Sequence, residues 1–522
     1  CIEQHFIFKN VIFFFLLHSK YILFRFSGLT EPLRTLILLL YRRTCVKVNY
    51  KFKTEPYVHQ LDAFHKSVNQ PYYGFFMEMG TGKSKVLIDN IAHLGNTLQI
   101  DFALIIAPKG VYRNWVEKEI PQHFPDDIRK YVCFWMASET KRYKDRVKEF
   151  FSSTKPGVKI FVMNVEAFSS LKGKKAGEWI AKKFGSQGLI AIDESTTIKN
   201  HKAKRTKSLL KISQEFKYKR ILTGSPITKS PMDIFSQADF LKPKLLGYDA
   251  FYAFQSRYAV LQKRTMGSHS FQQVLGYRNI SELTNKIDRF SFRVLKKDCL
   301  DLPDKLFTVR YVSLTSEQIR MYKEMQKLAL AELADGKLVT APQVITQMLR
   351  LQQLLSGHMR TDEGELVEVS SYRLEALMSC LEEATGKIII WSRFRYDIQK
   401  IQKTLTEHFG ESSVVCYYGD TKEDDRQQAI NRFQDGDARF FVANPATAGY
   451  GLTLTAANTV IYYANDFNLE TRSQSEDRCH RIGQRNPVTY IDLIAEGTID
   501  EKIIKALRDK INISAKVLGE EA

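Results

Sequence analysis

The sequence predicts two α/β lobes, each built on a parallel β-sheet with helices on both faces. Short, wholly apolar runs alternate with polar stretches of helix length over residues 46–243, and the same rhythm returns from Lys387 to Ile494. Parallel strands are apolar throughout because both of their faces are covered. Between these two regions the apolar spacing becomes helical. We therefore expect two doubly wound parallel-sheet lobes with a mainly helical insertion between them.

The domain boundaries follow from these changes of pattern. A chain of 522 residues is long enough for two or three domains. We expect the first lobe at 46–243, the insertion and linker at 244–371, and the second lobe at 372–522. The strands expected in the first lobe are Tyr73–Met77, Phe102–Ala107, Lys159–Met163, Leu189–Ile192 and Arg220–Leu222. Those expected in the second are Ile388–Trp391, Val414–Tyr418, Phe440–Ala443, Val460–Tyr463 and Val488–Ile494. The insertion should carry helices at Ser316–Ala334 and Ala341–Leu355.

Residues 1–45 differ from the rest of the chain. Their apolar runs are interrupted by Lys20, Arg25 and Arg34. No run reaches the ~18 apolar residues that a membrane helix needs. We interpret the segment as upstream sequence that is not part of the native protein, with a peripheral membrane anchor as the alternative.

Composition points to a polyanionic partner without proving one. The chain has 77 Lys and Arg against 58 Asp and Glu, a net charge of +19. Such a charge favours nucleic acid as a partner, although solubility alone could explain it. Seven cysteines without a C-x-x-C pair indicate reduced thiols and argue against a structural zinc site.

The segment Tyr72–Asp89 has the order strand, glycine turn, helix, which predicts a phosphate-binding loop. Glycines at 80 and 82 let backbone N–H groups point at phosphate oxygens. Lys83 would reach the β- and γ-phosphates, and the Ser84 hydroxyl would ligate Mg²⁺ at the helix N-terminus. Met77 stands where the standard motif has its first glycine. The predicted loop residues are Gly80, Thr81, Gly82, Lys83 and Ser84.

A second motif supports ATP binding. The strand Gly188–Ile192 ends in Asp193 and Glu194. Asp193 is placed to hold Mg²⁺, and Glu194 to accept a proton from the attacking water. A lone Asp-Glu pair is usually an exposed turn, but here it follows the phosphate loop across further strands, as a nucleotide-binding sheet requires. Together the motifs predict ATP and Mg²⁺ as cofactors.

Two arginines in the second lobe are the last candidates. Arg478 and Arg481 lie three residues apart, on one side of a helical turn. Two guanidinium groups aimed at the lobe interface would neutralise charge on the γ-phosphate in the transition state. The spacing alone favours surface salt bridges with Glu476 and Asp477 instead.

These segments together resemble the superfamily-two helicases, and within them the Swi/Snf-type DNA-dependent ATPases, from about Tyr57 to Ile504. The similar segments of the first lobe and linker are PYVHQ, MEMGTGKS, ALIIAPKGVYRNWVEKEI, DESTTIKN, RILTGSPI and FRVLKKDCLDLPDK. Those of the second lobe are IIIWSRF, GDTKEDDRQQAINRFQ, TAGYGLTLTAANTVIYYA and SQSEDRCHRIGQRN. The resemblance implies RecA-like lobes. The lack of added reader domains is similar to phage or bacterial members, which implies a cytoplasmic location, or a nuclear one if the source is eukaryotic.

The resemblance also implies roles for single residues. Gln60 would contact adenine, Gly451 and Gln474 would line the nucleotide site, and Arg478 and Arg481 become expected arginine fingers beside catalytic Glu194 and Lys83. Thr196 replaces the histidine of the family's Asp-Glu-Ala-His motif. In the family that histidine is linked to motif III, which corresponds here to RILTGSPI (Arg220–Ile227), so the link must be remade by a hydroxyl or lost. The nucleic-acid contacts implied by the resemblance are Lys109, Arg113, Asn114, Asn164, Thr223, Ser392, Arg393 and Thr453.

The function implied is ATP-driven movement on double-stranded DNA through sequence-independent phosphate contacts. A basic run at Lys199–Lys211 would add to this grip, although such runs are usually solvated helix faces. A strand-separating DNA or RNA helicase is the nearest alternative, and the linker Leu302–Lys305 argues against it. A motor subunit of a restriction or defence complex, with further protein partners, is another. A DNA-binding scaffold with an inactive ATPase is disfavoured by the intact motifs. No membrane partner is expected.

Overall fold

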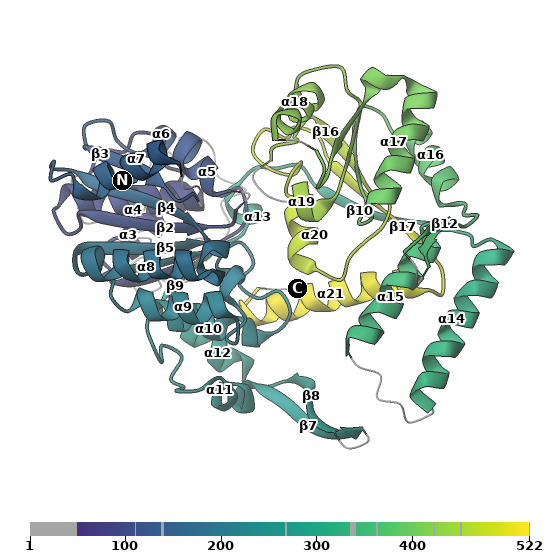
Figure 1. The fold of residues 1–522 in the computed structure, drawn as a ribbon, viewed down its shortest axis with the longest axis horizontal. Coiled ribbons are helices and arrows are strands. Elements are labelled where there is room, and N and C mark those ends of the chain that lie inside the picture. Colours follow the sequence, from purple (N-terminus) through teal and green to yellow (C-terminus); the bar gives the residue numbers. More distant parts are fainter. Residues whose placement is uncertain are drawn as a thin grey trace, which may run out of the picture.

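The computed structural model describes residues 50–109, 111–136, 140–266, 269–334, 341–361, 364–421, 423–448 and 452–520. The interpretation of residues 1–45 therefore lies outside the described residues. Two α/β lobes stand side by side, and a long C-terminal helix runs beneath both (Figure 1). Across the described ranges, no helix has both the length and the apolar character needed to cross a bilayer.

The first lobe is a seven-stranded sheet in the order β3-β4-β2-β5-β6-β1-β9, with every pairing parallel. Its strands are β1 (Tyr72–Met77), β2 (Phe102–Ala107), β3 (Lys130–Phe134), β4 (Val158–Asn164), β5 (Gly188–Asp193), β6 (Tyr218–Leu222) and β9 (Ser291–Val294). All five predicted strands are confirmed. The two missed strands, β3 and β9, lie at the sheet edges, where partial exposure breaks the apolar run.

Alternation along β2 explains how one sheet supports two cores. Phe102, Leu104 and Ile106 face one core, and Ala103 and Ile105 face the other. The first core is closed by α7 (Lys141–Ser152), α8 (Leu171–Phe184), α9 (Lys204–Ser213) and α10 (Ile234–Leu241). The second is closed by α3 (Val58–Ser67), α4 (Lys83–Asn96) and α6 (Ile120–His123). The predicted double winding is therefore confirmed.

The second lobe is a six-stranded parallel sheet in the order β10-β17-β16-β13-β15-β14. Its strands are β10 (Lys305–Val312), β13 (Lys387–Trp391), β14 (Val414–Tyr417), β15 (Phe440–Ala443), β16 (Ala457–Tyr462) and β17 (Val488–Ala495). Helices α16 (Arg373–Glu383) and α17 (Arg395–Phe409) cover one face, and α18 (Glu423–Gln434) covers the other. Again, the five predicted strands are present.

The segment 244–371 is less separate than the sequence predicts. Helices α14 (Ser316–Ala334) and α15 (Ala341–Leu355) have the predicted bounds. However, β9 joins the first sheet beside β1, and β10 joins the second beside β17. The segment also contains an antiparallel hairpin of β7 (Ala259–Met266) and β8 (His269–Tyr277), and a small pair of β11 (His358–Arg360) and β12 (Leu366–Glu368). Most side chains of β10 are exposed or half-buried, which hides the strand from an apolar-run search.

Helix α21 (Ile499–Val517) ties the two lobes together. At its start, Ile499 and Ile503 belong to a core cluster of the second lobe. At its end, Val517 lies in a core of the first lobe, and its carbonyl accepts a hydrogen bond from the Thr284 hydroxyl at 2.7 Å. Just beyond, Glu520 pairs with Arg293 at 2.6 Å. The lobes are thus connected by this helix as well as by the linker between β9 and β10.

Candidate functional site

The predicted phosphate loop connects β1 to α4, and its Gly80 lies beside Lys296 of the linker and Arg481 of the second lobe. Gly80 and Gly82 have φ values of 82° and 89°, in the region that favours glycine. A Cβ on Gly82 would lie 2.2 Å from the Gln60 amide nitrogen. A side chain at position 82 would therefore be excluded both by backbone conformation and by space.

Lys83 begins α4 and turns back over this loop. Its ammonium donates to the carbonyl of Met77 at 2.9 Å and to that of Glu78 at 3.4 Å. Burial lowers the pKa of Lys83, and the nearby carboxylates Glu194 and Asp193 oppose that shift. The structure thus brings the loop lysine and the two predicted acidic residues together.

The two carboxylates at the end of β5 are held differently. Asp193 accepts hydrogen bonds from the Trp115 indole at 2.9 Å and from the Glu194 backbone N–H at 3.0 Å, which fixes its orientation. Glu194 adopts a left-handed φ of 49°. Burial raises the pKa of Glu194 to about 7; Lys83 opposes the shift and Asp193 adds to it. A carboxylate with this pKa is suited to accept a proton near neutral pH.

Glu119 is a third carboxylate in the site, which the sequence did not single out. It ends a π-helical turn, Trp115–Glu119, and accepts hydrogen bonds from the Asn114 amide at 3.1 Å and from the Ser84 hydroxyl. Burial and the charge of Asp193 raise its pKa. The only sequence signal was its place in the family-like segment ALIIAPKGVYRNWVEKEI, four residues after Trp115. π-Turns are frequent at functional sites because they re-aim side chains.

The oxygen groups of this corner suit Mg²⁺. The Ser84 hydroxyl, Asp193 and Glu119 are all hard oxygen donors, which Mg²⁺ prefers. Over the described ranges, no group of three or more His, Cys, Asp or Glu side chains is arranged to hold a metal ion by itself.

The second lobe brings its two arginines to the same place. A Cβ built on Gly80 would lie 3.7 Å from the Cβ of Arg481. Burial lowers the pKa of the Arg481 guanidinium, and Asp477 and Glu119 oppose that shift. Arg478 is buried, and its positive charge acts to lower the pKa of Glu194. Both guanidinium groups donate to the Leu452 carbonyl, at 3.2 Å from Arg478 and 3.0 Å from Arg481.

The surface salt bridges favoured by spacing are wrong. Glu476 pairs with Arg472 at 2.7 Å and with Lys305 at 3.4 Å. Asp477 pairs with Lys296 at 2.6 Å. The acidic neighbours of the two arginines are therefore engaged by other cations.

Lys296, from the linker, spans the cleft. Its backbone N–H donates to the Glu78 carboxylate at 2.7 Å, beside the phosphate loop. Its ammonium donates to Asp477 at 2.6 Å and to the His480 carbonyl at 2.7 Å. One residue thus connects the phosphate loop to the arginine segment. The sequence marked the linker but not this lysine.

The Thr196 hydroxyl forms a new link between the lobes. It donates to Glu470 at 2.8 Å, at the start of α20 (Leu469–Glu476) in the second lobe. Lys199 pairs with the other oxygen of Glu470 at 3.1 Å and also donates to the Thr228 hydroxyl at 2.7 Å. The hydroxyl at position 196 therefore bonds across the cleft, and Lys199 contacts the segment that follows motif III.

We expect Glu470→Ala and Thr196→Val each to lower maximal ATP turnover about tenfold or more while leaving nucleotide affinity nearly unchanged. Both remove the hydrogen bond between Thr196 and Glu470, and Glu470→Ala also removes the ion pair with Lys199, so the double variant should be no worse than Glu470→Ala alone. Steady-state kinetics with nucleotide-binding titrations measures both effects. Thr196→Ser, which keeps the hydroxyl, is the matched control. Additive losses would show that the two side chains act separately.

The remaining predicted nucleotide residues vary in placement. Gln60 lies against the phosphate loop: its amide donates to the Thr81 carbonyl at 3.0 Å, and its oxygen accepts from the Tyr57 N–H at 3.1 Å. Gln474 is buried on α20, and its backbone carbonyl accepts a hydrogen bond from the Arg478 guanidinium at 3.0 Å. The prediction for Gly451 lies outside the described residues.

Some predicted nucleic-acid contacts are accessible. Lys109 is exposed, and its backbone N–H and the Asn164 amide both donate to Glu166, each at 3.1 Å. This places the ends of β2 and β4 together. Arg113 and Thr453 are exposed. Arg393 is half-buried and donates to Gln352 at 2.6 Å.

Two of those contacts need correction. Thr223 is fully buried and its hydroxyl approaches Glu194 at 3.4 Å. Ser392 is fully buried and donates to Asp397 at 2.7 Å. Buried hydroxyls already bonded within the protein do not reach a phosphate backbone, so we do not retain these two residues as DNA contacts. Asn114, like Arg393, is half-buried, and its amide donates to Glu119 at 3.1 Å, so its DNA contact stays a prediction.

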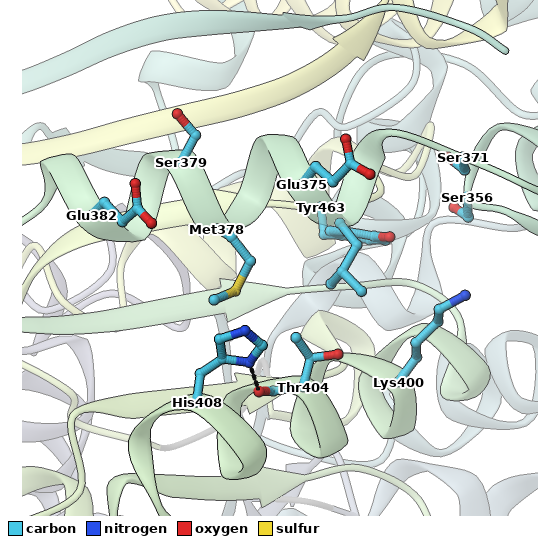
Figure 2. Close-up of a pocket in the computed structure, with 11 residues that line it drawn as sticks. Ser356, Ser371, Glu375, Met378, Ser379, Glu382, Lys400, Thr404, His408 and Tyr463 are labelled. Atoms are coloured by element: carbon cyan, nitrogen blue, oxygen red, sulfur yellow. Dashed lines mark hydrogen bonds between the residues drawn. The ribbon is translucent and has the colours of Figure 1, made fainter.

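A groove of about 450 Å³ lies elsewhere on the second lobe, between α16 and α17 (Figure 2). It is lined by side chains of both charges, including Glu375, Glu382 and Lys400. The His408 ring shares a 2.8 Å hydrogen bond with the Thr404 carbonyl there. None of the predicted nucleotide residues lines this groove, so it is separate from the ATP site.

Comparison with known proteins agrees with this geometry. A family model described as the SNF2-related domain matches residues 28–360, and one described as the helicase conserved C-terminal domain matches residues 372–483. An uncharacterized ATP-dependent helicase of Mycoplasma genitalium is 26% identical over 451 residues, covering 85% of this chain and 40% of the relative. The putative ATP-dependent helicase/translocase YwqA of Bacillus subtilis is 25% identical over 455 residues, covering 85% and 46%.

The chain thus spans less than half the length of these two relatives. Among solved structures, the SWI2/SNF2 ATPase core of Sulfolobus solfataricus in complex with dsDNA is 25% identical. The match covers 92% of this chain and 100% of that one, with a TM-score of 0.40. Because the SNF2-related model matches more than half of the sequence, and the helicase C-terminal model matches the second lobe, this chain belongs to the SNF2-related family of ATP-dependent helicase-like enzymes.

Proposed function

We propose that this SNF2-related enzyme hydrolyses ATP in the cleft between its lobes and uses the hydrolysis to move along duplex DNA. The observation that carries the proposal is the meeting of Lys83, Asp193 and Glu194 from one lobe with Arg478 and Arg481 from the other. A site completed by both lobes is assembled only when the lobes are close. Hydrolysis and lobe movement are then coupled.

In this proposal, the first lobe binds the nucleotide and activates water. Lys83 and the loop N–H groups hold the β- and γ-phosphates. Ser84 and Asp193 would hold Mg²⁺, which would neutralise phosphate charge, and Glu119 orients the Ser84 hydroxyl. Glu194 takes the proton from the water whose oxygen forms the new bond to the γ-phosphorus. The bond from that phosphorus to the β–γ bridging oxygen breaks, and ADP leaves with the electron pair.

The second lobe acts on the transition state. Arg478 and Arg481 are both positioned toward the carboxylate cluster, where charge grows on the transferring phosphoryl group. Lys296 and Glu470 set how closely the lobes approach, because Lys296 bonds to both sides of the cleft and Glu470, in the second lobe, bonds to Thr196 in the first. We assign these two as positioning residues rather than catalytic ones.

The DNA track rests on family membership, on charge and on the placement of exposed basic groups. Lys109 and Arg113 follow the carboxyl end of β2, on the same edge of the sheet as the phosphate loop. A DNA phosphate backbone bound there would therefore be displaced when the lobes move. The net charge of +19 favours a polyanion. No sequence-reading module is found in the motifs, so we expect contacts to phosphates rather than bases.

We expect duplex DNA to stimulate ATP hydrolysis more than RNA or single-stranded DNA does. Affinity should fall linearly with salt on a log–log plot and depend little on base sequence, because released counterions drive binding. The enzyme should displace a triplex-forming strand and leave a plain forked duplex closed, since a motor on the duplex backbone pushes off what lies in the groove. Stimulation by RNA alone would contradict the proposal.

One structural feature favours a strand-separating helicase as a second candidate. The β7–β8 hairpin projects from the first lobe beyond its helices (Figure 1). Its exposed side chains include Lys263, Arg264 and Leu275. A projecting hairpin is a shape that could part base pairs. Fork unwinding by the enzyme, lost when the hairpin is replaced by a short glycine-serine turn, would favour this candidate over the translocase.

A further inference from the structure

A second cavity lies in the first lobe, away from the proposed ATP cleft. It has a volume of about 510 Å³, opens between α7 and α8, and is bounded by Trp135 and Met136 after β3 and by Phe161 of β4. This volume is within the ~300–1,000 Å³ typical of ligand sites. No residue assigned to nucleotide or nucleic acid above lines it. The pocket is therefore not explained by the proposed function.

The floor of the pocket is apolar and aromatic. Phe151 lies 5.0 Å from Phe161 and 5.0 Å from Trp179 between ring centroids, with Trp179 edge-on. Trp135 and Val147 are half-buried beside them. Trp179 remains 47% exposed, which is high for a tryptophan. A large apolar surface left open in this way usually marks a site of interaction.

The rim of the pocket is entirely basic among its charged residues. None of the lining residues is acidic. Four exposed lysines line the opening: Lys144, Lys148, Lys172 and Lys183. The Lys183 ammonium lies over the Trp179 ring, 5.1 Å from its centroid. The nearby carboxylate Glu178 is turned toward Lys211, at 3.1 Å. The opening thus presents positive charge around an apolar floor.

We propose that this pocket binds an acidic amphipathic segment of a partner protein, whose bulky apolar side chain enters the floor while its carboxylates meet the lysine rim. Charge complementarity selects an acidic segment. The apolar floor selects one with a large hydrophobic anchor at helical spacing. A nucleic-acid strand fits less well, because Lys183 covers a face of Trp179 on which a base would stack.

The test uses a fluorescein-labelled synthetic peptide of aspartate and glutamate that carries one tryptophan and one leucine four positions apart. Fluorescence anisotropy with the full chain is expected to show saturable binding. Replacing the two apolar residues of the peptide by serine should weaken binding at least about tenfold, because the anchor is lost. The double variant Lys148→Glu, Lys183→Glu should weaken it by at least about tenfold as well.

The matched control is Lys174→Glu with Lys182→Glu, which reverses two exposed charges of α8 that do not line the pocket. It should bind the peptide like the wild type, and both double variants should retain basal ATP turnover. Ala176→Phe, which fills the pocket without changing charge, should also abolish binding. The proposal is overturned by absent binding, by equal loss in the control, by a serine peptide that binds as well, or by a single-stranded oligonucleotide that displaces the peptide.

Discussion

Glu194→Gln is expected to slow ATP turnover by at least ~100-fold, since a positioned general base contributes about 10²–10⁴. The side chain is buried, and its pKa is raised to about 7, mainly by burial. Glutamine keeps the size and the polar contacts of the side chain but has no oxygen basic enough to take the proton from water. ATP affinity should stay near that of the wild type, because the phosphates are held mainly by Lys83 and the loop.

Two variants separate this effect from loss of binding or folding. Lys83→Ala should weaken nucleotide binding itself, since it removes the ammonium beside the phosphate loop. Glu215→Gln changes an exposed glutamate of the same lobe and should behave like the wild type. Turnover and binding are measured by phosphate release and by titration with a fluorescent ATP analogue. Near-normal turnover in Glu194→Gln would mean that another group accepts the proton.

Arg481→Ala is expected to lower DNA-stimulated turnover by about 10³-fold or more, the range of effects found for arginine fingers. The guanidinium is half-buried, interacts electrostatically with Glu119 and comes from the lobe opposite the phosphate loop. Its attraction grows as negative charge builds on the transferring group, so it acts on the transition state more than on bound ATP. ATP affinity should therefore change much less.

The matched control is Arg485→Ala, which removes an exposed arginine four residues further along. It should leave stimulated turnover unchanged. Stimulated turnover is measured at saturating ATP and duplex DNA, so that a binding defect does not imitate a catalytic one. If Arg481→Ala instead weakened ATP binding and kept normal turnover at saturation, the residue would be a ground-state contact.

Much of the fold is readable from the sequence because buried parallel strands are apolar on both faces. That pattern located the predicted strands of both sheets, from β1 to β17. The search for apolar runs did not find strands β3, β9 and β10, because an edge strand keeps exposed positions that interrupt the run. It missed the hairpin β7–β8 for the same reason. Turn chemistry placed Gly80 and Gly82 correctly, since positive φ angles require glycine there.

The sequence by itself determined the two lobes, the phosphate loop and the acidic pair at the end of β5, because each depends on local order along the chain. Only the tertiary structure decided what meets across the cleft. Spacing favoured salt bridges for Arg478 and Arg481, yet Lys296, Lys305 and Arg472 occupy those acids. Glu119 lies in the segment ALIIAPKGVYRNWVEKEI but was not singled out there, and Glu470 joins the site from a segment without a motif of its own. Contacts between residues distant in sequence depend on how the lobes pack, and neither spacing nor periodicity along the chain records that packing.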